Sequence, residues 1–261
     1  MVIDFHTHIF SEKVAERALA NLSAACGITP YMDGTAAGLV SYMDKCGVDR
    51  AVVLPVMTKA SQTKRMNEWF ASLASERLIP FGGIHPDNED YKERILDIKR
   101  LGMKGVKMHP EYQNFWVDDE KMYPVYDEIL SQGLILLLHS GEDAAYQAPF
   151  RCTPQRLRNM VRAMGGGRIV AAHFGAHKMW DDVEEYLVGE NLYFDTSMGT
   201  QYYDMEQFCR IVRHHGADKI LFATDSPWSD AKQEMEMIRK SGLPEQMLEQ
   251  IFYQNAIELL A

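Results

Sequence analysis

Cysteine is scarce in this chain. Four of the 261 residues are cysteines, Cys26, Cys46, Cys152 and Cys209, and they stand far apart with no CxxC pair. Zinc knuckles and dithiol redox centres need closely spaced cysteines, so this spacing argues against both. None of the four ends a strand-like run, which argues against a catalytic thiolate. We expect reduced, partly buried thiols.

Basic surface and long apolar segments are also missing. Lys and Arg total 27 against 37 Asp and Glu, a formal charge of −10, and no basic stripe could neutralise a phosphate backbone. The longest apolar runs, such as Leu134 to Leu138, are far shorter than a membrane span, and no signal-peptide pattern precedes the first one. We therefore expect no nucleic-acid partner, no membrane association and a cytoplasmic location.

Low-complexity sequence is absent too, and the pattern that remains is a repeated alternation. Eight apolar, β-prone runs are separated by segments of helical character. The expected strands are 2–5, 51–54, 79–84, 105–108, 134–138, 168–172, 192–195 and 220–224. The expected helices are 11–26, 35–47, 88–102, 119–132, 153–164, 180–188, 204–215, 230–240 and 244–260.

This alternation predicts an α/β fold, a single (β/α)₈ TIM barrel that occupies residues 1–261 as one domain. An open doubly wound sheet is the alternative architecture. It is less well supported, because no Gly-rich turn follows the first strand as a nucleotide site there would require.

Histidines collect at the strand ends of this predicted barrel. Six of the nine fall at or just past the carboxyl end of an expected strand. They are His6, His8, His85, His109, His139 and His173. Asp225 follows the eighth strand and adds a carboxylate. In a barrel these ends converge on one face, where such enzymes carry their active sites.

Imidazole and carboxylate groups together suit zinc, manganese or iron. His6 and His8 stand two residues apart in an extended strand, so both can face one ion. A water on that ion would become more acidic, and Asp225 could take its proton while also touching the metal. His173 could hold or polarise a substrate oxygen that develops charge. The alternatives are a turn residue for Asp225 and a satisfied core residue for His173.

The motifs VIDFHTHIF, GVKMHPEYQNF, LILLLHSG, IVAAHFG and ILFATDSPW resemble the amidohydrolase superfamily. The resemblance covers nearly the whole chain. It is closest to the branch of predicted metal-dependent hydrolases that includes aminocarboxymuconate-semialdehyde decarboxylase. It implies that His6, His8, His139 and Asp225 bind the metal. It also implies that His173 is an active-site acid, base or hydrogen-bond donor in one-metal members and a ligand of a second metal in two-metal members.

Lys107 and His109 follow the fourth expected strand, and their roles stay open. Lys107 stands where two-metal relatives carry a carboxylated lysine, but it could equally bind a substrate carboxylate or form a salt bridge. We favour substrate binding for Lys107 and count His109 as a second substrate contact. Gln113 and Phe115, in the next loop, could line the pocket.

These observations give an expected function. We expect a hydrolase that uses one divalent ion rather than two, zinc first with manganese or iron as alternatives. It would activate water to cleave a C–N or C–O bond of a small carboxylated or cyclic substrate. Non-oxidative decarboxylation of an unsaturated or aromatic acid at the same metal is the closest alternative. A non-catalytic ligand-binding barrel and a metal-independent lactonase are weaker ones, and a homodimer is left open.

Overall fold

The apolar runs form a ring of parallel strands. A computed structural model describes residues 1–261. Every strand pair in it is parallel. The strands are β1 (Ile3–Thr7), β2 (Arg50–Val53), β3 (Leu78–Pro80), β4 (Gly82–Gly83), β5 (Gly105–Met108), β6 (Ile135–Leu138), β7 (Ile169–Ala171), β8 (Tyr193–Asp195) and β9 (Ile220–Leu221). The third expected strand is therefore divided into β3 and β4, on either side of Phe81.

Two seams join these strands into a closed barrel. Hydrogen bonding divides the strands into the sets β1–β3 and β4–β9. At one seam, the Phe81 amide donates to the Val53 carbonyl at 3.0 Å. At the other, the amide of Phe5 donates to the Phe222 carbonyl at 2.9 Å, and that of Asp225 donates to the His6 carbonyl at 2.8 Å. The predicted (β/α)₈ barrel is confirmed, with β3 and β4 together making its third strand.

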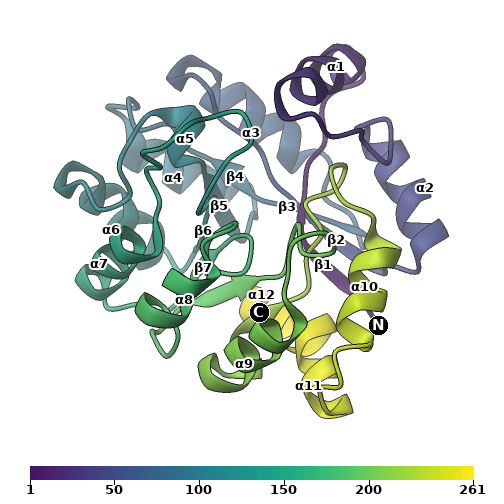
Figure 1. The fold of residues 1–261 in the computed structure, drawn as a ribbon. Coiled ribbons are helices and arrows are strands. Elements are labelled where there is room, and N and C mark those ends of the chain that lie inside the picture. The colour runs from purple at the N-terminus through teal and green to yellow at the C-terminus, as the bar shows by residue number, and fades with distance from the viewer.

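Helices surround the barrel, as Figure 1 shows. They are α1 (Ala15–Cys26), α2 (Ala36–Cys46), α3 (Thr63–Ala71), α4 (Tyr91–Arg100), α5 (Pro110–Gln113), α6 (Tyr123–Ser131), α7 (Pro154–Met164), α8 (Trp180–Tyr186), α9 (Met205–His215), α10 (Ala231–Arg239), α11 (Glu245–Glu249) and α12 (Asn255–Leu260). Some ends follow sequence signals: the Thr35 side chain accepts from the Gly38 amide, and Gly47 adopts the left-handed conformation after α2.

Local helix signals fail in other places. The helices α3 and α5 were not predicted. The helix expected over 244–260 is interrupted by a π-helical turn, Gln250–Gln254, between α11 and α12. Asn88 does not open α4, because its side-chain oxygen accepts from the His85 amide and the helix begins at Tyr91. None of the helices is both long and apolar enough to cross a membrane.

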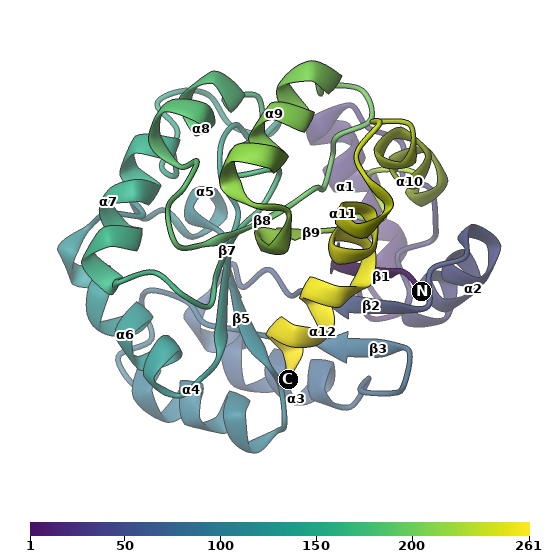
Figure 2. The same ribbon diagram turned by 90° about the horizontal axis from the view of Figure 1, so that it is seen from below.

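The helix α12 closes the amino-terminal end of the barrel. Ala256, Leu259 and Leu260 pack into the same buried cluster as the inward-facing strand residues Phe5 and Leu137. Figure 2 shows α12 lying across this end. A second, larger cluster fills the space between strands and helices. The carboxyl ends of the strands, where the histidines stand, lie at the opposite end of the barrel.

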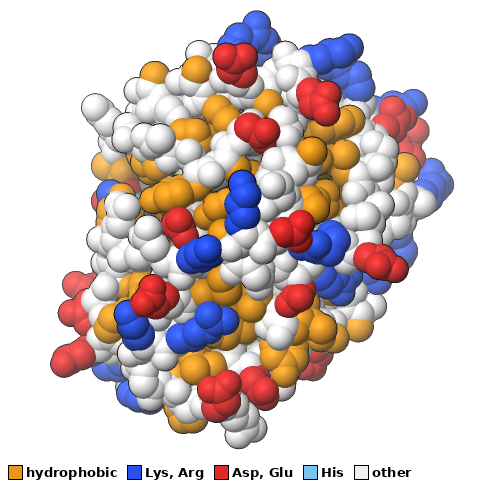
Figure 3. Space-filling view, turned by 90° about the vertical axis from the view of Figure 1, so that its right-hand side faces the viewer, with side chains coloured by type: hydrophobic (Ala, Val, Ile, Leu, Met, Phe, Trp, Pro, Cys, Tyr) orange, Lys and Arg blue, Asp and Glu red, His pale blue; other side chains and the backbone are white.

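On the face that carries α2 and α10, acidic and basic side chains are interspersed (Figure 3). This mixture fits the absence of a basic stripe in the sequence.

Candidate metal centre

A bulge in β1 turns the first two histidines towards the barrel axis. Ile3 and Phe5 pack inside the barrel, so His6 would face outward if side chains simply alternated. The register with β2 shifts between Asp4 and Thr7, where one extra residue is accommodated. The Asp4 carboxylate holds this bend, because Oδ1 accepts from the amides of His6 and Thr224, each at 3.1 Å.

His6, His8 and Asp225 meet at the mouth of the barrel. The two Nε2 atoms lie 3.1 Å apart, and Asp225 Oδ1 lies 3.3 Å from His6 Nε2 and 3.1 Å from His8 Nε2. His6 Nδ1 lies 2.8 Å from Asp195 Oδ2, and His8 Nδ1 lies 2.9 Å from the Leu54 carbonyl oxygen. A carboxylate and a carbonyl only accept, so both Nδ1 atoms carry hydrogen.

The atoms that converge are thus two imidazole nitrogens and a carboxylate oxygen, each of which can offer a lone pair. They repel one another unless a proton or a cation lies among them. Ligands held about 2.0–2.1 Å from one ion are separated by about 3.0–3.4 Å, which matches the observed spacing. His139 Nε2, a further imidazole nitrogen of the mouth, is buried without any hydrogen-bond partner. The donor set therefore fits a divalent cation.

His139 belongs to a second group. Its ring stacks on that of His109, with centroids 4.1 Å apart and an angle of 9° between the planes. Asp143 Oδ2 lies 3.4 Å from His109 Nε2 and 3.9 Å from His139 Nε2. The structure thus brings His6, His8 and Asp225 together as expected, and it groups His139 with His109 and Asp143. That His139 completes the ligand set stays a prediction.

His173 lies between the two groups, and both of its ring nitrogens are engaged. Nε2 is 3.0 Å from His139 Nδ1, and Nδ1 is 2.9 Å from the Ser197 hydroxyl. The backbone at His173 has φ 59°, and at Asp225 φ is 67°, a region that residues with a Cβ rarely adopt. Such strained positions cluster at functional sites.

Burial governs the protonation of these groups. It lowers the pKa of His6, His139 and His173 well below the ordinary range. Each of these rings is therefore neutral near pH 7 and carries a single N–H. Burial raises the pKa of the Asp225 carboxyl, against the lowering effect of His8. The centre thus combines neutral imidazoles with a carboxyl that holds a proton more readily than usual.

A family model described as "Amidohydrolase" matches residues 3–261. The chain belongs to the amidohydrolase family. No curated protein matches it in sequence.

Solved structures resemble this amidohydrolase over nearly its whole length. An uncharacterised TIM-barrel protein from Bordetella bronchiseptica is 18% identical, with a TM-score of 0.78 and 99% of this chain and 98% of that one covered. A 5-carboxyvanillate decarboxylase from Sphingomonas paucimobilis is 17% identical, with TM-score 0.73 and coverage of 99% and 98%. A dihydroxybenzoic acid decarboxylase from Polaromonas sp., with bound manganese and the inhibitor 2-nitroresorcinol, is 16% identical, with TM-score 0.70 and coverage of 99% and 96%. At these identities the likeness shows the fold.

Lys107 is buried in the mouth of this amidohydrolase barrel. Its Nζ lies 3.3 Å from His6 Nε2, and it forms no ion pair, so the salt-bridge alternative is not supported. Burial lowers its pKa to about 8, while Asp195 and Asp225 act in the opposite direction. The ammonium is therefore the major form near pH 7.

Two pocket candidates prove to be structural. Gln113 Oε1 accepts from the His109 amide at 2.8 Å, and Nε2 donates to the carbonyls of Met57 and Ile84. Phe115 is part of the larger core cluster. Both residues therefore brace the loop after β5, and their expected place in the pocket lining is not supported.

Other residues of the centre were missed. Asp195, Ser197 and Asp143 all lie against its histidines. Asp195 stands at a strand end, which was the available signal. Nothing comparable marks Ser197 or Asp143, because their place depends on how the loops after β8 and β6 fold.

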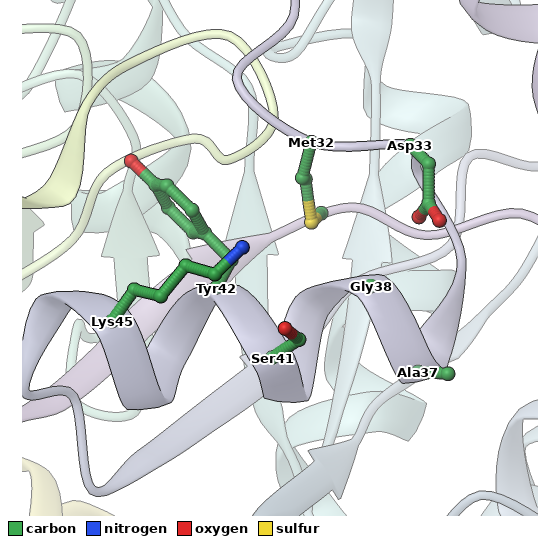
Figure 4. Close-up of a pocket in the computed structure, with 7 residues that line it drawn as sticks. All are labelled: Met32, Asp33, Ala37, Gly38, Ser41, Tyr42 and Lys45. Atoms are coloured by element: carbon green, nitrogen blue, oxygen red, sulfur yellow. The ribbon is translucent and has the colours of Figure 1, made fainter.

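A hollow on the surface lies apart from this centre. It measures about 350 Å³ and is lined by residues of α2 and of the loop before it, Met32, Asp33, Ala37, Gly38, Ser41, Tyr42 and Lys45. Figure 4 shows the side chains of Tyr42, Ser41 and Lys45 rising from α2, with Met32 on the loop above the helix. No histidine lines this hollow, so we assign no chemistry to it.

Proposed function

We propose that this amidohydrolase is a metal-dependent, non-oxidative decarboxylase of a small hydroxylated aromatic acid. The observation that carries the proposal is the convergence of His6 Nε2, His8 Nε2 and Asp225 Oδ1 at the barrel mouth. Such a set fits one divalent ion, zinc or manganese. The similar structures named above include decarboxylases of 5-carboxyvanillate and of a dihydroxybenzoic acid, the latter with manganese bound. They favour decarboxylation over hydrolysis, the first expectation from the sequence.

The reaction replaces a carboxylate on a ring carbon by hydrogen and releases CO₂. When bound, the ion would act as a Lewis acid towards the oxygen atoms of the substrate. The ammonium of Lys107 would hold an anionic oxygen of the substrate. Asp225 would hold the proton and deliver it to the ring carbon, a role that its raised pKa favours.

The role of His173 needs adjustment. Because both of its ring nitrogens already have protein partners, it has no free nitrogen for a substrate oxygen. We propose that it acts through its neighbour, by holding the His139 ring. His139 Nε2 is then the nitrogen of this group that is free to face a ligand.

Metal content and CO₂ release test the proposal. The protein is purified without chelator or a histidine tag, its metal is measured by plasma mass spectrometry, and 5-carboxyvanillate and 2,6-dihydroxybenzoate are supplied as probes. We expect about one metal per chain and one CO₂ for each molecule of acid consumed. His8→Ala should lose both metal and turnover. His214→Ala, which removes an exposed histidine of α9, should retain both.

Asp225→Asn tests proton delivery, with metal content measured in the same protein because Asp225 Oδ1 also belongs to the proposed donor set. It keeps the size of the side chain, and general acid–base catalysis contributes about 10²- to 10⁴-fold, so kcat should fall by that range. Turnover of amide, ester or lactone substrates without CO₂ would instead establish hydrolysis. Decarboxylation that survives complete metal removal would contradict the proposal.

A further inference from the structure

Asp195 accepts hydrogen bonds from His6 of the first group and from His173 and Ser197, which lie between the two groups. It lies at the end of β8 and is completely buried. Oδ2 lies 2.8 Å from His6 Nδ1. Oδ1 accepts from the amides of His173 and Ser197, each at 3.1 Å, and from the Ser197 hydroxyl. Both oxygens of this carboxylate therefore accept hydrogen bonds. The positions of the donors determine which ring nitrogens of the neighbouring histidines carry hydrogen.

One branch of hydrogen bonds leads from Asp195 to His6, His8 and Asp225, which we call the metal triad. Oδ2 can only accept, so His6 must donate from Nδ1. A neutral ring has one N–H, which leaves His6 Nε2 bare towards His8 and Asp225. A carboxylate behind a metal-binding histidine fixes its tautomer in this way.

The other branch runs through Ser197. Its hydroxyl has one hydrogen, which goes to Asp195 Oδ1, so its oxygen must accept from His173 Nδ1. His173 Nε2 is then bare and accepts from His139 Nδ1. The single hydrogen of the His139 ring is thus used, and His139 Nε2 is left bare, in agreement with its having no partner.

We infer that Asp195 is the positioning residue that sets the tautomers of both groups, directly at His6 and through Ser197 and His173 at His139. The inference rests on the proposed function insofar as the bare nitrogens are there to bind the ion. Asp195 itself touches neither the ion nor the substrate. Its effect is to keep two Nε2 atoms free of hydrogen at the same time.

The two branches can be broken separately. In Asp195→Asn, the amide oxygen must take the place of Oδ1, because two backbone N–H groups and a hydroxyl point at it. The amide NH₂ then faces His6 Nδ1 and donates to it. The His6 hydrogen moves to Nε2, where it points into the triad, while the Ser197 branch keeps its acceptor.

Ser197→Ala has the opposite effect. Without the hydroxyl, His173 Nδ1–H loses its acceptor in a buried site, so the hydrogen moves to His173 Nε2 and donates to His139 Nδ1. His139 then carries its hydrogen on Nε2. His6 keeps its bond to Asp195. His8 is an internal control in both variants, because its Nδ1 faces the Leu54 carbonyl and does not contact Asp195.

Nitrogen-15 NMR of metal-free protein with labelled histidines tests the inference, since it distinguishes protonated from bare ring nitrogens. In the native chain, His6, His8, His139 and His173 should all carry hydrogen on Nδ1. In Asp195→Asn the hydrogen should move from Nδ1 to Nε2 in His6 alone. In Ser197→Ala it should move from Nδ1 to Nε2 in His173 and His139 alone. Manganese and zinc affinity, measured by competition with a chelating dye, should fall about 10- to 100-fold in Asp195→Asn.

The outcomes separate the two proposals. If the native chain binds no metal, the proposed function fails, whereas the NMR spectra still decide the tautomers. If it binds metal but Asp195→Asn changes neither the His6 tautomer nor the affinity, the inference is overturned and the function stands. Should Asp195→Asn not fold, the native spectra and Ser197→Ala are sufficient, and a native His6 with hydrogen on Nε2 would overturn the inference.

Discussion

Glu234 should make the stability of this barrel depend on pH. It lies on α10 and is completely buried. Oε1 accepts from the amides of Gly199 and Thr200 at 3.0 and 3.2 Å and from the Ser229 hydroxyl. Oε2 has no partner. One carboxyl group therefore ties the loop after β8 to the loop after β9, which also carries Asp225.

The magnitude follows from the pKa of this group. Burial raises it from 4.5 to about 7. Because this pKa is higher in the folded than in the unfolded chain, protonation of Glu234 stabilises the fold. This stabilisation is complete below pH 4.5 and is lost as pH rises through about 7. The full contribution to the free energy of unfolding is about 3 kcal/mol. Roughly 1.4 kcal/mol of it is lost between pH 6 and pH 8.5.

Glu234→Gln removes the titration and retains an oxygen acceptor for the two loops. Melting temperatures of both proteins are measured by scanning calorimetry at pH 6 and pH 8.5. The melting temperature of the native chain should fall by about 3 to 5 °C more than that of the variant over this range. The reason is that 1 kcal/mol shifts the melting temperature of a domain of 150–250 residues by about 2–4 °C. Other groups, Asp4 among them, titrate in both proteins and cancel. Equal losses would refute the assigned pKa of Glu234.

Two further substitutions address the mouth of the barrel. Gly141→Ala should destabilise by on the order of 3 kcal/mol or more, because φ is 86° and a Cβ would overlap the His177 backbone nitrogen. Gly133→Ala, at φ 76° with nothing within 4 Å, should cost only about 1 kcal/mol, so equal melting temperatures would contradict the steric argument. Lys107→Met should raise KM for an aromatic acid about 10- to 100-fold, since a hydrogen bond to a charged group contributes about 1.5–3 kcal/mol. The exposed Lys104→Met is its control in the same steady-state assay, and an unchanged KM in Lys107→Met would show that this ammonium does not hold the substrate.

The barrel and the meeting of His6, His8 and Asp225 could be predicted because both follow from strand order. Parallel strands place their carboxyl ends together whatever the loops do. The bulge could not be predicted, because alternation counted from Ile3 and Phe5 would have turned His6 outward. A one-residue irregularity in strand pairing leaves no pattern in composition or spacing.

The loops account for most of what was missed. Gln113 has the right position for a pocket residue, but three hydrogen bonds to backbone groups occupy it. Ser197 carries no motif, and its importance arises only where it bridges Asp195 and His173. Which nitrogen of a histidine is bare depends on such partners and not on the histidine itself.

The seam between β1 and β9 has a consequence for how the protein is made. His6 and His8 are synthesised about 220 residues before Asp225 and the backbone groups that pair with β1. The strands in between can pair with their neighbours as they appear, but the first and last must wait for each other, and such long-range pairings are slow. We therefore expect the candidate metal centre to form only after β9 has been synthesised, and any ion held by all three residues to bind after that point.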